Sequence, residues 1–225
     1  MSFFLDPQDP RVAVFMRGIS KVYPDGVVAL RDVDFQVLKG EVHAVLGENG
    51  AGKTTLMRIL YGEIKPTRGE IWVWGRRVSF SSPRDALANG IAMVYQNFTL
   101  VPNFTVFENI YLAVTSIRKA GRGEVRGRLA ELMEKTGLKV DMDAVVEELP
   151  VGLQQRVEIL KALMAGAKLL ILDEPTSVLT PLETRALFEF IKALKAMGVT
   201  VILITHKLRE VKAIADRVTV LRRGR

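Results

Sequence analysis

The 225-residue chain contains no cysteine. This absence excludes disulfides, zinc–thiolate sites and a cysteine nucleophile, and it fits a reducing compartment. Aromatic residues make up only 7% of the chain. No apolar run reaches the roughly 18 residues of a membrane span, and the apolar start at 3–5 is cut short by Asp6 and Pro7. We therefore expect a cytoplasmic protein that is neither exported nor membrane-spanning.

The chain has a net charge of +7, and 48% of its residues are hydrophobic. This length and composition suit one large α/β domain, alone or with a subordinate lobe. Basic residues without interleaved aromatics are a weak signal for nucleic acid, and a surface near anionic lipid or a solvated helix face explains them as well. We favour the solvated face and expect no nucleic acid partner. The basic residues in question are Arg118, Lys119, Arg122, Arg126 and Arg128.

The stretch 47–54 reads GENGAGKT and matches the pattern GxxxxGK[ST] at every fixed position. In this motif, closely spaced glycines turn backbone N–H groups towards phosphate oxygens, a lysine reaches the β and γ phosphates, and a hydroxyl ligates magnesium. An apolar strand at 41–46 precedes the stretch and helical spacing follows it, so the phosphates would lie at a helix N-terminus. We call 47–54 the phosphate loop. The candidate nucleotide-binding residues here are Gly47, Asn49, Gly50, Ala51, Gly52, Lys53, Thr54 and Thr55.

An antiparallel β layer is predicted at the start of the chain. Its segments alternate in polarity around the turn residues 24–26. A further hairpin, 71–74 with 77–80, flanks Gly75. Tyr23 lies in this layer, where its ring could stack on an adenine base or simply pack in the turn. The predicted early segments are 12–16, 19–23, 27–30 and 33–37.

Between residues 97 and 156 the pattern changes from β-branched apolar runs to amphipathic helices. Thr105 and Glu108 form a capping box that begins a helix extending to about residue 117. A second helix is predicted over 124–135, before Gly137, and a third opens near residue 152 and extends to about 165. We therefore predict one nucleotide-binding domain, 1–225, with core segments 1–96 and 157–225 and an inserted α-helical subdomain at 97–156.

Four apolar strands each end in a reactive group. Uninterrupted apolar strands are covered on both faces, which predicts a parallel sheet whose ligands bind at the carboxyl ends of the strands. The expected fold class is α/β, a phosphate-loop NTPase core with an N-terminal antiparallel layer. The strands 41–46, 91–94, 168–172 and 199–204 lead respectively into the phosphate loop, Gln96, Asp173 with Glu174, and His206.

The chemistry of these residues suggests their roles. Asp173 would hold Mg²⁺ together with Thr54, directly or through water. Glu174 can act as general base towards the attacking water. Gln96 can orient that water or complete the metal shell, and His206 can hydrogen-bond the γ-phosphate. ATP and Mg²⁺ are thus the expected cofactors.

These residues resemble the ATP-binding cassette of ABC transporters along essentially the whole chain. In that family, Tyr23 would occupy the position of the adenine-stacking aromatic, Gln96 that of the glutamine loop, and His206 that of the switch histidine. Asp173 and Glu174 resemble the Walker B pair. The segment 149–156, LPVGLQQR, resembles the family signature. The residues that would serve a partner's ATP site are Pro150, Val151, Gly152, Leu153 and Gln154.

This resemblance implies a head-to-tail dimer in which each signature helix completes the ATP site of the other cassette. The motifs around 94–106, 157–163 and 178–181 are similar to those of bacterial simple-sugar and nucleoside importers, and we favour nucleoside. In that branch two cassettes are commonly fused, and this chain is similar to the first, so we expect a fragment. Its partners would be a second cassette, fused or separate, permease subunits at the cytoplasmic face of the membrane and, indirectly, an extracytoplasmic solute-binding protein.

The permease is expected to contact the segment 97–108. The apolar side chains expected to make this contact are Phe98, Leu100, Val101, Phe104 and Phe107. Two other classes remain open. A soluble cassette protein acting on ribosomes or DNA would usually carry its own insertions or zinc cysteines, and a small-molecule kinase would lack the glutamine loop and signature together.

Two positions depart from the family pattern. Pro150 replaces the signature serine and has neither a hydroxyl nor an N–H group. Pro150 therefore cannot donate a hydrogen bond to the γ-phosphate in its partner's site. We expect an asymmetric pair, in which the ATP bound by this chain's phosphate loop is hydrolysed and the opposite site works weakly. Thr180 stands where many cassettes have an aspartate, but with Pro181 and Glu183 it also forms a capping box that begins a helix.

Overall fold

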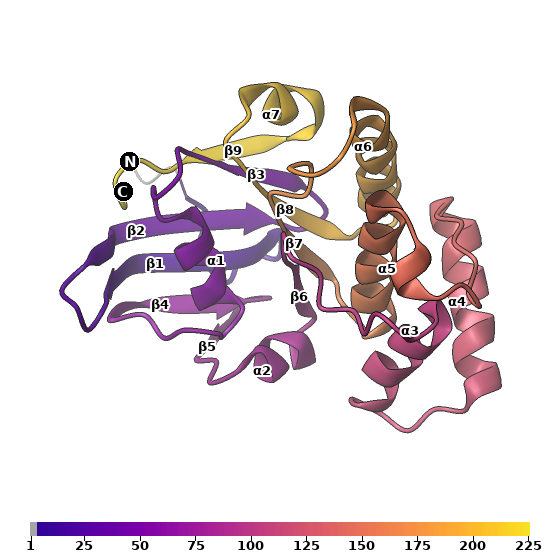
Figure 1. Ribbon diagram of the computed structural model, residues 1–225. Coiled ribbons are helices and arrows are strands. Elements are labelled where there is room, and N and C mark those ends of the chain that lie inside the picture. The colour runs from indigo at the N-terminus through magenta and orange to yellow at the C-terminus, as the bar shows by residue number, and fades with distance from the viewer. Residues whose placement is uncertain (1–3) are drawn as a thin grey trace.

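The computed structural model describes residues 4–225, and its centre is a five-stranded parallel sheet with the order β6-β7-β8-β3-β9 (Figure 1). All four neighbouring pairs are parallel. Alternate residues of each strand face opposite sides of the sheet. On β8, Ile202 and Ile204 pack in one hydrophobic cluster, whereas Val201 and Leu203 pack in the other. The predicted parallel core is therefore confirmed. Its strands are β3 (Val42–Leu46), β6 (Ile91–Val94), β7 (Leu169–Asp173), β8 (Thr200–Thr205) and β9 (Arg217–Val220).

The antiparallel layer forms a separate four-stranded sheet with the order β2-β1-β4-β5. It comprises β1 (Val12–Val22), β2 (Val28–Leu38), β4 (Arg68–Val73) and β5 (Arg76–Val78). The hairpin predicted around Gly75 thus joins this layer, and Trp74 and Gly75 both have positive φ, as a two-residue type I′ turn requires.

The early segments differ from the prediction because pairs of them merge into single strands. Segment 12–16 and all but the last residue of segment 19–23 belong to β1, whose pairing with β2 shifts register between Met16 and Ile19. At this point Gly18 has a φ of 60° and its N–H donates to Asp34 Oδ1 at 2.7 Å. The bulge breaks the polar alternation without ending the strand.

Helices cover the sheets and form the two cores. Helix α1 (Lys53–Leu60) lies against the antiparallel sheet, as Figure 1 shows, and buries Leu56 and Met57 there. On the opposite face of the parallel sheet, α6 (Pro181–Ala196) contributes Phe190 and Leu194 to the second core. The short helices α2 (Pro83–Ala88) and α7 (Leu208–Ile214) complete the core region.

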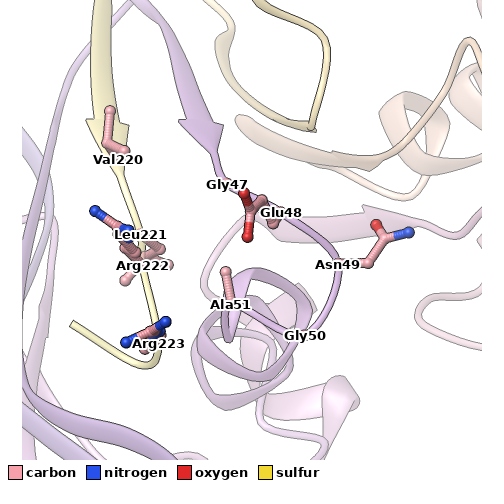
Figure 2. A pocket seen from close by; sticks show the side chains of 9 residues that line it. All are labelled: Gly47, Glu48, Asn49, Gly50, Ala51, Val220, Leu221, Arg222 and Arg223. Atoms are coloured by element: carbon pink, nitrogen blue, oxygen red, sulfur yellow. The ribbon is translucent and has the colours of Figure 1, made fainter.

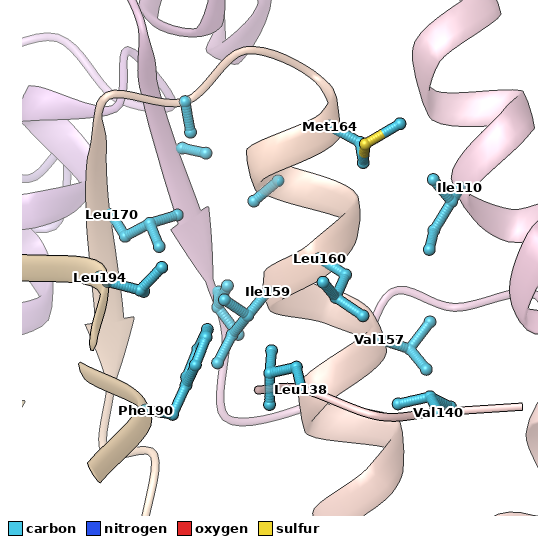
Figure 3. Close-up of a cluster of buried hydrophobic side chains, with 14 of the residues drawn as sticks. Ile110, Leu138, Val140, Val157, Ile159, Leu160, Met164, Leu170, Phe190 and Leu194 are labelled. Atoms are coloured by element: carbon cyan, nitrogen blue, oxygen red, sulfur yellow. The ribbon is translucent and has the colours of Figure 1, made fainter. Parts of the chain in front are cut away.

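The inserted region is helical, as predicted. It contains α3 (Val106–Thr115), α4 (Arg122–Thr136), the 3-10 turn η1 (Val146–Glu148) and α5 (Val151–Met164). Figure 3 shows that α5 places Val157 and Leu160 between Ile110 of α3 and Leu170 of β7. The predicted division at residue 156 therefore falls inside a helix that packs against both parts.

The basic stretch around α4 is engaged in local contacts. Arg118 and Arg126 form ion pairs with Glu124 and Asp143 at 2.7 and 2.6 Å, and every side chain in these pairs is at least 40% exposed. Such exposed pairs contribute little to stability, and their arrangement suits the solvated face that we favoured.

One predicted permease contact is wrong. Phe107 is only 2% exposed and stacks on Tyr111 with ring centroids 5.6 Å apart. Arg122 and Arg126 cover its ring at 5.1 and 4.7 Å. The capping box at Thr105 directs this side chain into the helical core, whereas Phe104 stays exposed.

No helix among residues 4–225 is long and apolar enough to cross a membrane.

Candidate functional site

The phosphate loop joins β3 to α1, as expected for a phosphate-binding turn at a helix N-terminus. Lys53 is the first residue of α1 and is only 5% exposed. Its ammonium donates to the carbonyl oxygens of Gly47 and Glu48 at 2.7 and 2.9 Å. The backbone of the phosphate loop thus surrounds the Lys53 ammonium, which places a positive charge within the loop.

Two glycines of this loop are required by close approaches. A Cβ on Gly47 would collide with the carbonyl oxygen of Leu221. Gly52 has a φ of 104°, and a Cβ there would lie 2.8 Å from the Ala29 carbonyl oxygen and from Leu30 Cδ2. Any larger residue would therefore displace the loop.

The C-terminal residues support the loop from behind. Leu221 N donates to Leu46 O at 2.8 Å and Gly224 N donates to Ala51 O at 3.0 Å. Figure 2 shows the phosphate loop facing residues 220–223. These two segments line a pocket of about 210 Å³. Sequence reasoning missed this support because it is made by backbone groups, which leave no side-chain signal.

Thr54 and Asp173 meet at the carboxyl ends of β3 and β7. The Thr54 hydroxyl donates to Asp173 Oδ1 at 3.4 Å. Burial and the neighbouring Glu174 carboxylate raise the pKa of Asp173 above its ordinary value, so its ionised form is destabilised. A cation nearby would relieve this cost, and a hydroxyl with a carboxylate is a donor set that suits the hard cation Mg²⁺.

Glu174 and His206 form the second pair. Nδ1 of His206 lies 3.3 Å from Oε1 of Glu174, and their side chains are 43% and 20% exposed. Glu174 has a φ of 44°, a conformation that costs a non-glycine residue roughly 1–3 kcal/mol. Its N–H is held by the Ile204 carbonyl oxygen at 3.0 Å. Asp173 and Glu174 are adjacent in the chain, yet their carboxylates contact different residues. Asp173 accepts from Thr54, and Glu174 pairs with His206.

Among residues 4–225, Gln96 and Tyr23 form no hydrogen bond with the other predicted site residues. Gln96 follows β6, whose pairing with β7 places it at the same sheet edge as Asp173, and its exposed side chain makes no hydrogen bond with residues 4–225. Tyr23 is half-buried in the β1–β2 turn, where its N–H donates to Val27 O at 2.9 Å. Lys21 Nζ lies 5.3 Å from its ring. The outer loop residues Asn49 and Gly50 are exposed, and Thr55 is half-buried.

The signature segment 149–156 begins α5. Pro150 is the N-cap, and its carbonyl oxygen accepts hydrogen bonds from Leu153 N and Gln154 N at 2.9 and 3.0 Å. Pro150 supplies no side-chain cap. Val151 is exposed, and a Cβ on Gly152 would lie 2.6 Å from Glu183 Oε1 of α6. Proline thus preserves the helix start while removing the polar group expected there.

Gln155 lies in the signature segment, but the sequence analysis assigned it no role. It is 4% exposed, and its Nε2 donates to the Pro175 carbonyl oxygen at 2.5 Å. This bond connects α5 to the turn that follows Asp173 and Glu174. Only the fold brings residues 20 positions apart together, although a glutamine on the apolar side of a helix could have raised the question.

The chain is similar in sequence to import proteins over most of its length. It is 49% identical over 218 residues to the ribose import ATP-binding protein RbsA 3 of Rubrobacter xylanophilus, covering 94% of this chain and 43% of the relative. It is also 49% identical over 212 residues to the nucleoside import ATP-binding protein NupA of Lactococcus lactis subsp. cremoris, covering 93% and 42%. The chain therefore spans less than half the length of these curated relatives.

Solved structures and a family model agree with this similarity. The crystal structure of the ADP conformation of MJ1267, an ATP-binding cassette of an ABC transporter, superposes with a TM-score of 0.85 at 26% identity, covering 95% of this chain and 88% of that one. The structure of cbiO1 from Clostridium perfringens, part of the ABC transporter complex cbiONQ, gives a TM-score of 0.83 at 28% identity, covering 96% and 86%. The family model described as ABC transporter matches residues 30–177. The chain therefore belongs to the ABC transporter family.

Proposed function

We propose that this chain is an ATP-binding and ATP-hydrolysing cassette. The observation that carries the proposal is the convergence of two pairs at one sheet edge beside the phosphate loop: Thr54 with Asp173 at 3.4 Å and His206 with Glu174 at 3.3 Å. Lys53 adds a buried positive charge next to them. This set provides phosphate binding, metal binding and a base, which are the parts that phosphoryl transfer to water requires.

Each residue has a distinct part in this proposal. The phosphate loop and Lys53 hold the β and γ phosphates, and Glu174 accepts a proton from the attacking water. His206 contacts the γ-phosphate, and Gln96 orients the water. Thr54 and Asp173 would hold Mg²⁺, with Gln96 completing its shell. The ion would neutralise charge on the phosphate oxygens.

The adenine and the partner cassette complete the proposed site. Tyr23 stacks on the base, which its half-exposed ring permits. A second cassette, fused or separate, approaches head to tail and presents its own signature helix to this phosphate loop. In return, the segment from Pro150 to Gln154 faces the partner's nucleotide.

We further propose that ATP hydrolysis powers solute import. The named relatives are import proteins for ribose and for nucleosides. A nucleoside is the more specific hypothesis, which rests on the motifs around 94–106, 157–163 and 178–181, and a simple sugar is the alternative. The cassette would bind permease subunits at the cytoplasmic face of the membrane and depend indirectly on an extracytoplasmic binding protein. A soluble cassette acting on nucleic acid or ribosomes is less favoured by these names.

Two measurements test this function. Phosphate release from ATP by the purified chain, with and without Mg²⁺, tests hydrolysis. Co-purification with membrane permease subunits, followed by uptake of radiolabelled nucleoside or ribose, tests coupling and identifies the solute. Magnesium-independent turnover, or transfer of phosphate to an acceptor other than water, would contradict the proposal.

A further inference from the structure

A buried carboxylate lies between the two loops that carry Glu174 and His206. Glu210 belongs to α7 and is only 6% exposed. Its Oε2 accepts a hydrogen bond from Thr205 Oγ1 at 2.6 Å, and its Oε1 accepts one from Thr176 Oγ1. Thr176 lies two residues after Glu174, and Thr205 immediately precedes His206. One side chain therefore bonds to both loops.

Lys207 completes this arrangement. Its ammonium lies 3.4 Å from Glu210 Oε1 and donates to Thr176 Oγ1 at 3.1 Å. Its backbone N–H donates to Thr205 Oγ1 at 3.0 Å. Each threonine hydroxyl thus donates to the carboxylate and accepts from Lys207. We call these four residues, Thr176, Thr205, Lys207 and Glu210, the loop clamp.

The loop clamp holds both neighbours of His206. The histidine side chain is itself 43% exposed, and it pairs with Glu174. Its position therefore depends on the backbone of Thr205 and Lys207. The same clamp fixes Thr176, which follows the strained turn at Glu174. Glu210 thus bonds to a residue close in sequence to each member of the pair whose atoms, His206 Nδ1 and Glu174 Oε1, lie 3.3 Å apart.

Packing alone does not account for a carboxylate at this position. Burying a charge is costly, and an apolar side chain of similar volume generally stabilises a protein as well or better. A fully bonded buried carboxylate does, however, fix the geometry of several groups at once. Here the groups that it fixes belong to two loops of the proposed catalytic site.

We propose that Glu210 is a positioning residue for ATP hydrolysis, which sets the geometry of His206 relative to Glu174 through Thr176 and Thr205. This inference rests on the proposed ATPase function. Glu210 does not touch the nucleotide in this account. Its loss should therefore lower turnover without weakening ATP binding.

The test compares Glu210→Gln and Thr205→Val with the double variant, in the same chain. Glu189→Gln on α6 is a matched control, because that carboxylate is 72% exposed and contacts only Lys192 among the described ion pairs. The measurements are kcat, the dissociation constant for Mg-ATP, and the imidazole NMR signals. The chain has two histidines, His43 and His206, and the buried His43 serves as an internal reference for intact folding.

We expect each single variant to lower kcat about tenfold, a loss that misplacement by a fraction of an ångström can produce. The Mg-ATP dissociation constant should change less than twofold, and only the His206 signals should move. The double variant should lose little more than either single one, because both disrupt the same loop clamp.

Wild-type kcat in both single variants, or an equal loss of ATP binding, would overturn the inference. Movement of the His43 signals would show a general loss of structure, and Thr205→Val alone then decides the question. Absence of hydrolysis in the wild-type chain would refute the proposed function instead. In that case, unmoved His206 signals in the variants would separately refute the positioning role.

Discussion

The Asp173 carboxylate occupies a position that costs the folded protein free energy. Burial and Glu174 raise its pKa in the folded state, so between its ordinary value and the raised value the folded state binds more protons than the unfolded chain. The contribution of this residue to stability therefore falls as pH rises through that interval.

Asp173→Asn should accordingly raise the melting temperature of the nucleotide-free chain at neutral pH and abolish its magnesium-dependent hydrolysis. Near pH 3 the gain in melting temperature should disappear, because wild-type Asp173 is then protonated as well. Calorimetry at both pH values measures this. A lower melting temperature for the variant at neutral pH would contradict the account.

Lys53 supplies the charge inside the phosphate loop. Lys53→Ala removes a charge-assisted contact to phosphate, which is worth about 1.5–3 kcal/mol, or roughly 10- to 100-fold in affinity. Isothermal titration with ATP measures the loss, and Lys139→Ala, at an exposed position, provides the control. Equal affinities in the two variants would exclude Lys53 as a phosphate ligand.

Single residues differ in how far the sequence predicts their roles. Lys53, Asp173 and His206 follow strands or match a motif, so pattern and spacing single them out as candidates. Gln155 and Glu210 act through tertiary bonds to residues 20 and 34 positions away. No local pattern records such distances, which is why only the structure finds them.

At the scale of elements, the start of α6 shows what local chemistry can predict. Thr180 Oγ1 accepts from Glu183 N at 3.3 Å, and Glu183 Oε2 accepts from Thr180 N at 2.8 Å. The predicted capping box is therefore confirmed, as is the one at Thr105. These bonds also lower the pKa of Glu183. A capping box joins residues only three positions apart, so the sequence alone is enough to predict it.

Thr180→Ala should destabilise the chain by about 1 kcal/mol, because it removes the N-cap. Thr180→Asp should keep stability within about 0.5 kcal/mol because aspartate caps equally well. Urea unfolding measures both, with Arg185→Ala as a control in the exposed part of the same helix. Equal stabilities for the Ala and Asp variants would mean that the capping bond contributes nothing.

The strands of the antiparallel layer show the limit of pattern reading. The bulge near Gly18 in β1 and the positive φ of Asp32 in β2 break the alternation. In the sequence, β1 and β2 therefore each look like two short strands instead of one long strand. Strand pairing depends on partners far along the chain, so the continuous strands become evident only in the folded sheet.

For the whole molecule, the parallel sheet and the meeting of its reactive strand ends follow from the apolar runs, whereas the strand order β6-β7-β8-β3-β9 comes only from the structure. The sequence does not predict that α5 packs against both the helical subdomain and the parallel sheet. Amphipathic spacing predicts a helix, but it does not show where one subdomain ends and the next begins when a single helix packs against both. The exposure of Val151 beside Pro150 leaves this helix start available to a second cassette.

We predict that Pro150→Ser tightens ATP-dependent association of the two cassettes and raises ATP turnover, since the serine hydroxyl would bond the partner's γ-phosphate. One such hydrogen bond to a charged group is worth about 1.5–3 kcal/mol. Analytical ultracentrifugation with ATP and an assay of phosphate release measure the two effects. No change in either would refute the proposed asymmetry.

The most direct test of the central claim compares ATP binding and phosphate release in the Glu174→Gln variant and the wild-type chain. Glutamine keeps the shape of the side chain but cannot accept the proton from water. We predict that ATP binds with wild-type affinity while phosphate release falls by at least about 100-fold, within the range for removal of a general base. Wild-type phosphate release by the variant would contradict the account, because Glu174 would then not be the base.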